Sequence, residues 1–81
     1  MYEQYAPANW PLDNREDHEA LLVTSQEYNM AFAWAIDIAT RKGWTRDELL
    51  SAAFRYVNIE GLAAQAIVYA FRYLANKQVA A

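Results

Sequence analysis

The sequence contains no cysteine, one histidine, two glycines and two prolines in 81 residues. Without cysteine the chain has no disulfides, no thiolate nucleophile and no cysteine-based metal site. One histidine is too few for a multi-histidine metal centre. Two glycines are too few for a phosphate-binding loop or for the many tight turns of a sandwich or barrel. We therefore expect neither a bound metal nor a cofactor.

Charged residues are also scarce: they make up 21% of the chain, and the net charge is −3 at pH 7. A mildly acidic chain lacks the basic surface that binds a phosphate backbone, so nucleic acid is not expected as the main partner. The longest apolar runs, residues 30–36 and 61–71, are about half the length that spans a membrane. The first residues show no pattern of a secretory signal. We expect a cytoplasmic protein without membrane contact.

What the chain does contain is apolar, since 56% of its residues are hydrophobic and 15% are aromatic. This composition excludes a disordered chain, and the length allows one domain, spanning residues 1–81. The apolar residues recur at helical rather than strand spacing. We predict an all-α fold, a small three-helix domain with helices at about 14–42, 46–57 and 59–77.

Capping signals support the start of the second predicted helix and the end of the first. Thr45 and Glu48 have the spacing of a capping box, and Trp44 and Leu49 stand at the positions of a hydrophobic staple. Gly43 follows the first helix, where a glycine commonly ends a helix in the left-handed conformation. These neighbouring signals predict that the first helix ends and the second begins within residues 43–45.

Further signals mark the other helix ends. Residues 13–16 match a capping box at the start of the first helix, and Asn58 can cap the third after a connection of one or two residues. Thr24 and Ser25 mark the place where the long first helix bends or breaks, because their hydroxyls compete for backbone hydrogen bonds.

The first twelve residues hold Tyr2, Tyr5 and Trp10 together with both prolines, and they show no helical periodicity. Proline keeps such a segment extended, and three aromatic rings are costly to expose to water. We predict an extended aromatic strap at the N-terminus that packs across the helices. The alternative is an arm that reaches a partner or a second subunit.

Residues 30–39 contain a single charged residue, Asp37, so apolar side chains point in all directions around this part of the first helix. Such a helix must be covered on every side, yet a domain of this size buries only about 60–65% of its unfolded surface. We therefore predict a homodimer or higher oligomer. The candidate self-association residues are Met30, Ala31, Trp34, Ala35 and Ile38.

Residues in patterns typical of catalysis are not found. His18 lies in an acidic first turn, where we expect it to be solvated. Neither Ser25 nor Ser51 lies in a nucleophile motif. Paired carboxylates occur at helix starts, where capping explains them. We expect no enzyme activity.

Protein binding is the function that this composition favours, because tyrosine and tryptophan are enriched at protein interfaces. We expect a small stoichiometric inhibitor or an accessory subunit. Inhibitors of this size are common products of phages and plasmids, where they block a host enzyme or defence complex; this is a general frequency and not a property of these residues. The residues expected to contact a partner are Tyr2, Tyr5, Trp10, Arg41, Lys42, Trp44 and Arg46.

Two alternatives stay open. A short connection between the helices at 46–57 and 59–77 would give a helix-turn-helix-like DNA-binding regulator, in which Gln65 alone would face base edges. The aromatic side chains could instead line a pocket of a helical bundle that binds a small molecule.

Overall fold

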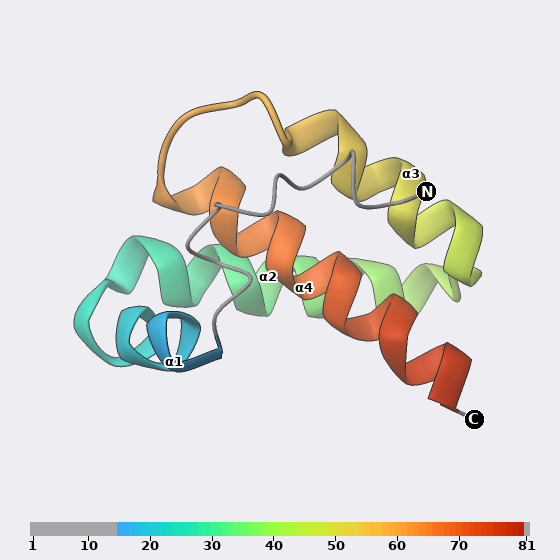
Figure 1. Ribbon diagram of the computed structural model, residues 1–81, viewed down its shortest axis with the longest axis horizontal. Helices are drawn as coiled ribbons and strands as arrows, with labels where there is room; N and C mark the ends of the chain where they lie inside the picture. The colour runs from blue at the N-terminus through green and yellow to red at the C-terminus, as the bar shows by residue number, and fades with distance from the viewer. Residues whose placement is uncertain (1–14, 81) are drawn as a thin grey trace.

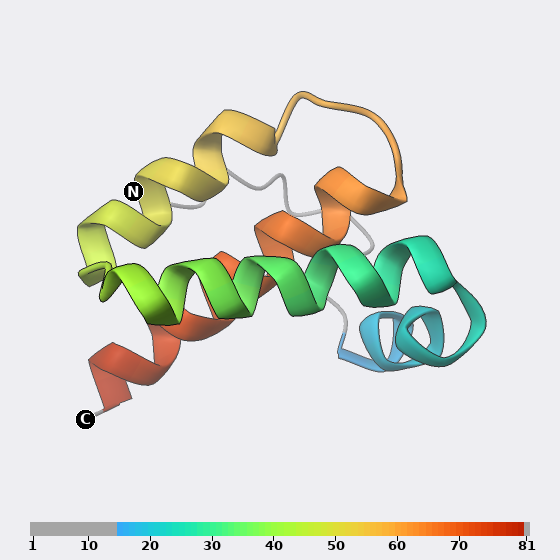
Figure 2. The same cartoon turned by 180° about the vertical axis from the view of Figure 1, so that it is seen from behind.

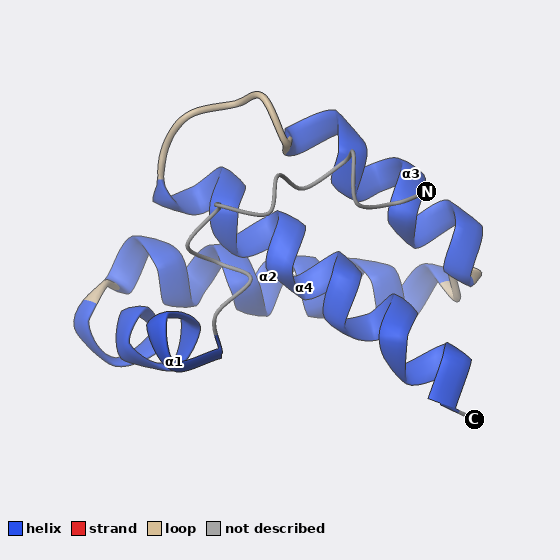
Figure 3. Cartoon of the chain, in the orientation of Figure 1, coloured by secondary structure: helices blue, strands red, loops and turns tan. Residues whose placement is uncertain are grey.

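The computed structural model describes residues 15–80, except for the side chains of residues 79 and 80. These residues form four α-helices, α1 (Arg15–Thr24), α2 (Gln26–Lys42), α3 (Arg46–Tyr56) and α4 (Leu62–Ala80), and no strand occurs among them (Figures 1 and 3). The predicted all-α fold is confirmed. The predicted N-terminal strap and the first capping box begin outside the described residues.

The single helix predicted at 14–42 is in fact two helices, separated at Ser25, where the sequence indicated a bend or break. Ser25 has extended backbone (φ −124°, ψ 113°), and its hydroxyl accepts a hydrogen bond from the Tyr28 amide at 3.1 Å. The Thr24 hydroxyl donates to the Ala20 carbonyl at 2.8 Å. Both hydroxyls satisfy backbone groups at a helix end, so the chain can turn here and α1 folds back beside α2 (Figure 2).

The corner between α2 and α3 follows the predicted signals closely. Gly43 adopts the left-handed conformation (φ 64°) and its amide bonds back to the last turn of α2. The Thr45 hydroxyl accepts from the Glu48 amide at 3.3 Å, while the Glu48 carboxylate accepts from the Thr45 amide at 2.8 Å. The capping box is therefore confirmed, and α3 begins at Arg46.

The connection between α3 and α4 is longer than predicted. It occupies residues 57–61, and α4 begins at Leu62 rather than at residue 59 and runs on to Ala80 rather than 77. Gly61 has a φ of +117°, which no residue inside a right-handed helix can adopt. The helical hydrogen bonds begin at the carbonyl of Gly61, which accepts from the Gln65 amide at 3.2 Å.

Helix α4 is the central element, and it packs against both α2 and α3. None of residues 62–72 is exposed. Alanines supply much of the core and allow the helix axes to approach closely. The main core cluster consists of Ala35, Ala39, Leu49, Leu50, Ala53, Ile67, Val68, Ala70, Phe71 and Ala75. Within residues 15–80, no helix combines the length and the apolarity needed to cross a membrane.

Candidate functional site

The outer side of α2 carries an apolar row that we call the α2 flank: Met30, Trp34 and Ile38, spaced four residues apart. Met30 is 61% exposed and Trp34 is 49% exposed, whereas Ile38 is partly buried. The opposite side of the helix holds Tyr28 and Ala35, which have no exposed surface. α2 therefore uses one side for the core and presents large apolar side chains on the other. In Figure 2 the helix lies in front of α4.

The five residues expected to mediate self-association are thus divided between surface and core. Ala35 is buried inside the chain, and Ala31 is partly buried against the main core cluster and against a smaller cluster formed by Tyr28 and Ala66. Neither position supplies much surface to a second molecule, because these small side chains face α4, whose axis they allow to come close. Met30, Trp34 and Ile38 remain as the surface candidates.

The corner between α2 and α3 holds four of the residues expected to contact a partner. Trp44 is partly buried, its ring edge-to-face with that of Phe71 at a centroid distance of 5.4 Å. Arg41 and Lys42 are exposed, and Arg46 is partly buried. The corner is therefore a cationic edge around a tryptophan that belongs to the core. The other three candidates, Tyr2, Tyr5 and Trp10, lie outside the described residues.

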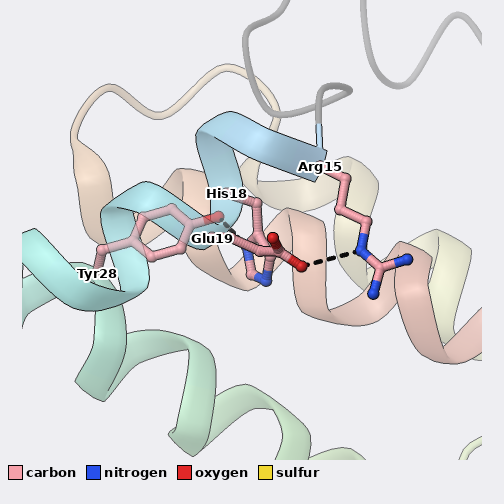
Figure 4. A network of polar contacts seen from close by, with 4 residues as sticks. All are labelled: Arg15, His18, Glu19 and Tyr28. Carbon is pink, nitrogen blue, oxygen red and sulfur yellow. Dashed lines mark hydrogen bonds and ion pairs between the residues drawn. The ribbon is translucent and has the colours of Figure 1, made fainter.

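His18 is not solvated, as its acidic neighbours suggested, but buried, with 6% of its surface exposed. Its Nδ1 lies 2.6 Å from the Tyr28 hydroxyl (Figure 4). The imidazole stacks on the Tyr69 ring at a centroid distance of 3.6 Å and an interplanar angle of 6°. The Phe32 ring packs at 4.8 Å. The turn at Ser25 causes this burial, because it lays α1 against α2 and α4.

The environment fixes the protonation of both partners in this hydrogen bond. Burial lowers the pKa of His18; the nearby Glu19 carboxylate opposes this shift and Arg15 adds to it. Burial, with a smaller contribution from Tyr69, raises the pKa of the Tyr28 hydroxyl well above its usual value. At neutral pH the pair is therefore an uncharged imidazole and an uncharged phenol.

The direction of the hydrogen bond follows from the burial of Tyr28. Its side chain is completely inaccessible, and among residues 15–80 the hydroxyl has no acceptor other than His18 Nδ1. A buried hydroxyl that does not donate is costly, so the Tyr28 hydroxyl donates to Nδ1. A neutral imidazole that accepts at Nδ1 carries its proton on Nε2.

The sequence contains a pattern that predicts the burial of His18, although the charged residues around it suggested exposure. His18, Leu21 and Leu22 have the i, i+3, i+4 spacing of one helix face, and both leucines pack against Tyr28 and its neighbours. The surrounding Glu16 and Glu19 lie on the exposed side. Helical periodicity, and not the local density of charge, was the informative feature.

The described residues bring together no cluster that would hold a metal ion. Within residues 15–80, no three histidine, aspartate or glutamate side chains come close enough to hold a metal ion. Burial raises the pKa of the Tyr28 hydroxyl, so this group stays protonated at neutral pH and its anion is not available as a base. Comparisons with protein families, with curated proteins and with solved structures found no match to this chain.

Proposed function

We propose that this protein is a non-catalytic protein-binding module, an inhibitor or accessory subunit, that contacts its partner through the α2 flank. The observation that carries the proposal is the exposure of Met30 and Trp34 on successive turns of a helix whose other side is fully packed. Exposed methionine and tryptophan side chains at adjacent positions are typical of interface centres, where a large ring buries much area at little entropic cost.

The surroundings of the flank support the same proposal. Asp37 and Arg41 form an ion pair one turn beyond Trp34, with nitrogen and oxygen 2.5 Å apart and both side chains largely exposed. Protein interfaces commonly combine an apolar centre with such a polar, solvent-accessible rim. The flank and this pair together have that composition.

The DNA-binding alternative receives less support from the geometry. A recognition helix must present side chains to the bases, and α4 is the helix that would occupy that position. None of its residues 62–72 is exposed, because α4 packs against α2 and α3. Gln65 is itself partly buried. Protein binding therefore remains the function that we propose.

A comparison of two surface variants tests this proposal. Met30→Gln with Trp34→Gln removes the apolar centre of the flank, and Val23→Gln removes an apolar side chain that is 87% exposed on α1. We expect the wild type and Val23→Gln to recover the same proteins from lysate of the native host, as identified by mass spectrometry. The double variant should bind a recovered partner at least about 30-fold more weakly, the scale of a hot spot.

Melting curves confirm that both variants are folded. Equal recovery of the same partner by the double variant and by Val23→Gln would contradict the proposal that the α2 flank is the contact surface. Tight binding of the wild type to a mixed-sequence DNA duplex at low salt, with no protein partner recovered, would favour the DNA-binding alternative.

A further inference from the structure

A second feature, independent of the α2 flank, is a cavity of about 500 Å³ where α1, α2 and α4 meet. Its apolar lining consists of Leu22 from α1, Phe32 and Ile36 from α2, and Tyr69 and Tyr73 from α4. Small-molecule sites are commonly of this size, with aromatic and aliphatic walls and a few polar groups at fixed positions. The walls here have that composition, so the polar groups decide what the cavity can bind.

The polar group held most rigidly at the cavity is the imidazole of His18. The ring is more than nine-tenths buried, it is fixed by the hydrogen bond to Tyr28 and by stacking on Tyr69, and it lines the cavity. Tyr28 is not part of the lining, so we infer that the ring faces the cavity with the edge that points away from Tyr28. Figure 4 shows the second ring nitrogen, Nε2, on that edge of the ring, away from the Tyr28 hydroxyl.

This edge carries a hydrogen-bond donor. Because the Tyr28 hydroxyl donates to Nδ1, Nε2 bears the proton of the neutral ring. Among residues 15–80 the ring makes no hydrogen bond other than the one to Tyr28. A bound molecule with an acceptor atom would therefore pair a polar N–H for which residues 15–80 provide no acceptor, beside apolar walls where such a bond is strong.

The charges at the cavity argue against an ionic ligand. Arg15 and Glu19 both line it, and their side chains form an ion pair with nitrogen and oxygen 3.0 Å apart (Figure 4). The two charges cancel locally, so neither an anion nor a cation gains a net attraction that would offset the loss of its hydration. An uncharged molecule avoids this desolvation cost.

We propose that the cavity binds an uncharged, ring-shaped and largely apolar small molecule that accepts a hydrogen bond from Nε2 of His18. The rings of Phe32, Tyr69 and Tyr73 provide the stacking and edge contacts that select a flat molecule. The single donor then selects a carbonyl, ether or comparable acceptor on that molecule and sets its orientation.

Prodan, an uncharged naphthalene with a ketone acceptor and polarity-sensitive emission, is a suitable probe for titration by fluorescence. Leu22→Trp fills the cavity with a larger ring, whereas Val23→Trp adds the same ring at the neighbouring position, which points into solvent. We expect saturable one-to-one binding to the wild type and to Val23→Trp, and loss of this binding in Leu22→Trp. Absence of saturable binding to the wild type, or equal binding by both variants, would overturn the proposal.

A second titration tests the hydrogen bond separately from the apolar contacts. It compares prodan with the same aminonaphthalene lacking the ketone, on the wild type and on His18→Phe, which keeps a stacked ring but has no N–H. We expect prodan to lose about three- to tenfold in affinity on this substitution and the ketone-free compound to be nearly unaffected. Equal losses for both compounds would refute the role of Nε2. If His18→Phe does not fold, the two tryptophan variants still decide whether the cavity binds.

Discussion

At the scale of single residues, the buried His18 makes the stability of the fold depend on pH. The pKa of His18 is lowered from about 6.5, chiefly by burial, so the folded protein binds this proton less readily than the unfolded chain does. The contribution of uncharged His18 to stability is therefore fully present above the unfolded pKa. It is lost as the pH falls through 6.5 toward the lowered pKa of the folded state.

The prediction is that the urea midpoint of the wild type decreases between about pH 7.5 and about pH 5.5, a window above the titration of ordinary carboxylates. His18 is the sole histidine of the chain, so His18→Gln is a clean control. The variant should have a lower urea midpoint than the wild type, and this midpoint should be nearly independent of pH in this window. A wild type no more sensitive to pH than the variant would show that His18 is solvated after all.

A second prediction concerns the hydroxyl of Tyr28. Tyr28→Phe removes the partner of His18 Nδ1 and leaves a buried nitrogen without a hydrogen bond, which should cost about 1–3 kcal/mol of unfolding free energy. Tyr73→Phe is the matched control, because Tyr73 is exposed and the change should be within about 0.5 kcal/mol. Urea denaturation at neutral pH measures both. Equal, small effects would mean that the Tyr28–His18 bond contributes nothing.

At the scale of elements, what could be predicted depended on whether the signal was local. Thr45 and Glu48 satisfy each other's backbone amides, so the start of α3 was readable from four residues. The hydroxyl of Ser25 marked a weak point, but whether the helix bends or breaks there depends on what α1 gains by packing against α2 and α4. That gain involves His18 and Tyr69, which are 51 positions apart and share no local pattern.

The start of α4 and the exposure of α2 were missed for related reasons. Asn58 is a good cap in isolation, yet the chain continues to Gly61, whose positive φ makes the turn onto the core. The apolar run at 30–39 indicated complete burial, whereas α2 buries one side only. Sequence patterns report the preference of a segment, and the distribution of neighbours around it is decided by the whole chain.

Helix α3 carries the third prediction, at its first turn. Thr45→Ala removes the cap and should cost about 0.5–2 kcal/mol. Trp44→Ala should cost about 2 kcal/mol, roughly half the value for a fully buried ring, because Trp44 is partly buried against Phe71. Urea denaturation measures both. A Trp44→Ala protein with an unchanged melting temperature would identify Trp44 as a surface residue and make the corner with Arg41 and Lys42 a competing contact surface.

At the scale of the whole molecule, packing against α4 covers much of the apolar surface for which the sequence predicted a second chain. It packs against both α2 and α3, so none of its residues 62–72 is exposed. Part of the remaining surplus is on the α2 flank, where Met30 and Trp34 stay exposed on one helix; the other large apolar side chains exposed among residues 15–78 are Val23, Phe54, Ile59 and Tyr73. A twofold axis through this flank would place each row against its copy, the simplest way for identical chains to cover it.

The last prediction is therefore that the protein without its partner forms a homodimer through the α2 flank, which the partner then covers in place of the second copy. Light scattering at micromolar concentration should give at least twice the chain mass of 9.3 kDa. Trp34→Lys should give a folded monomer, because the charge lies on the surface and interferes only with the contact. Ala35→Glu should lose association and fold together, because it places a charge in the core against α4. A wild type that stays monomeric at high concentration would contradict self-association and leave the flank to the partner alone, whereas a Trp34→Lys dimer would move the self-association surface away from α2.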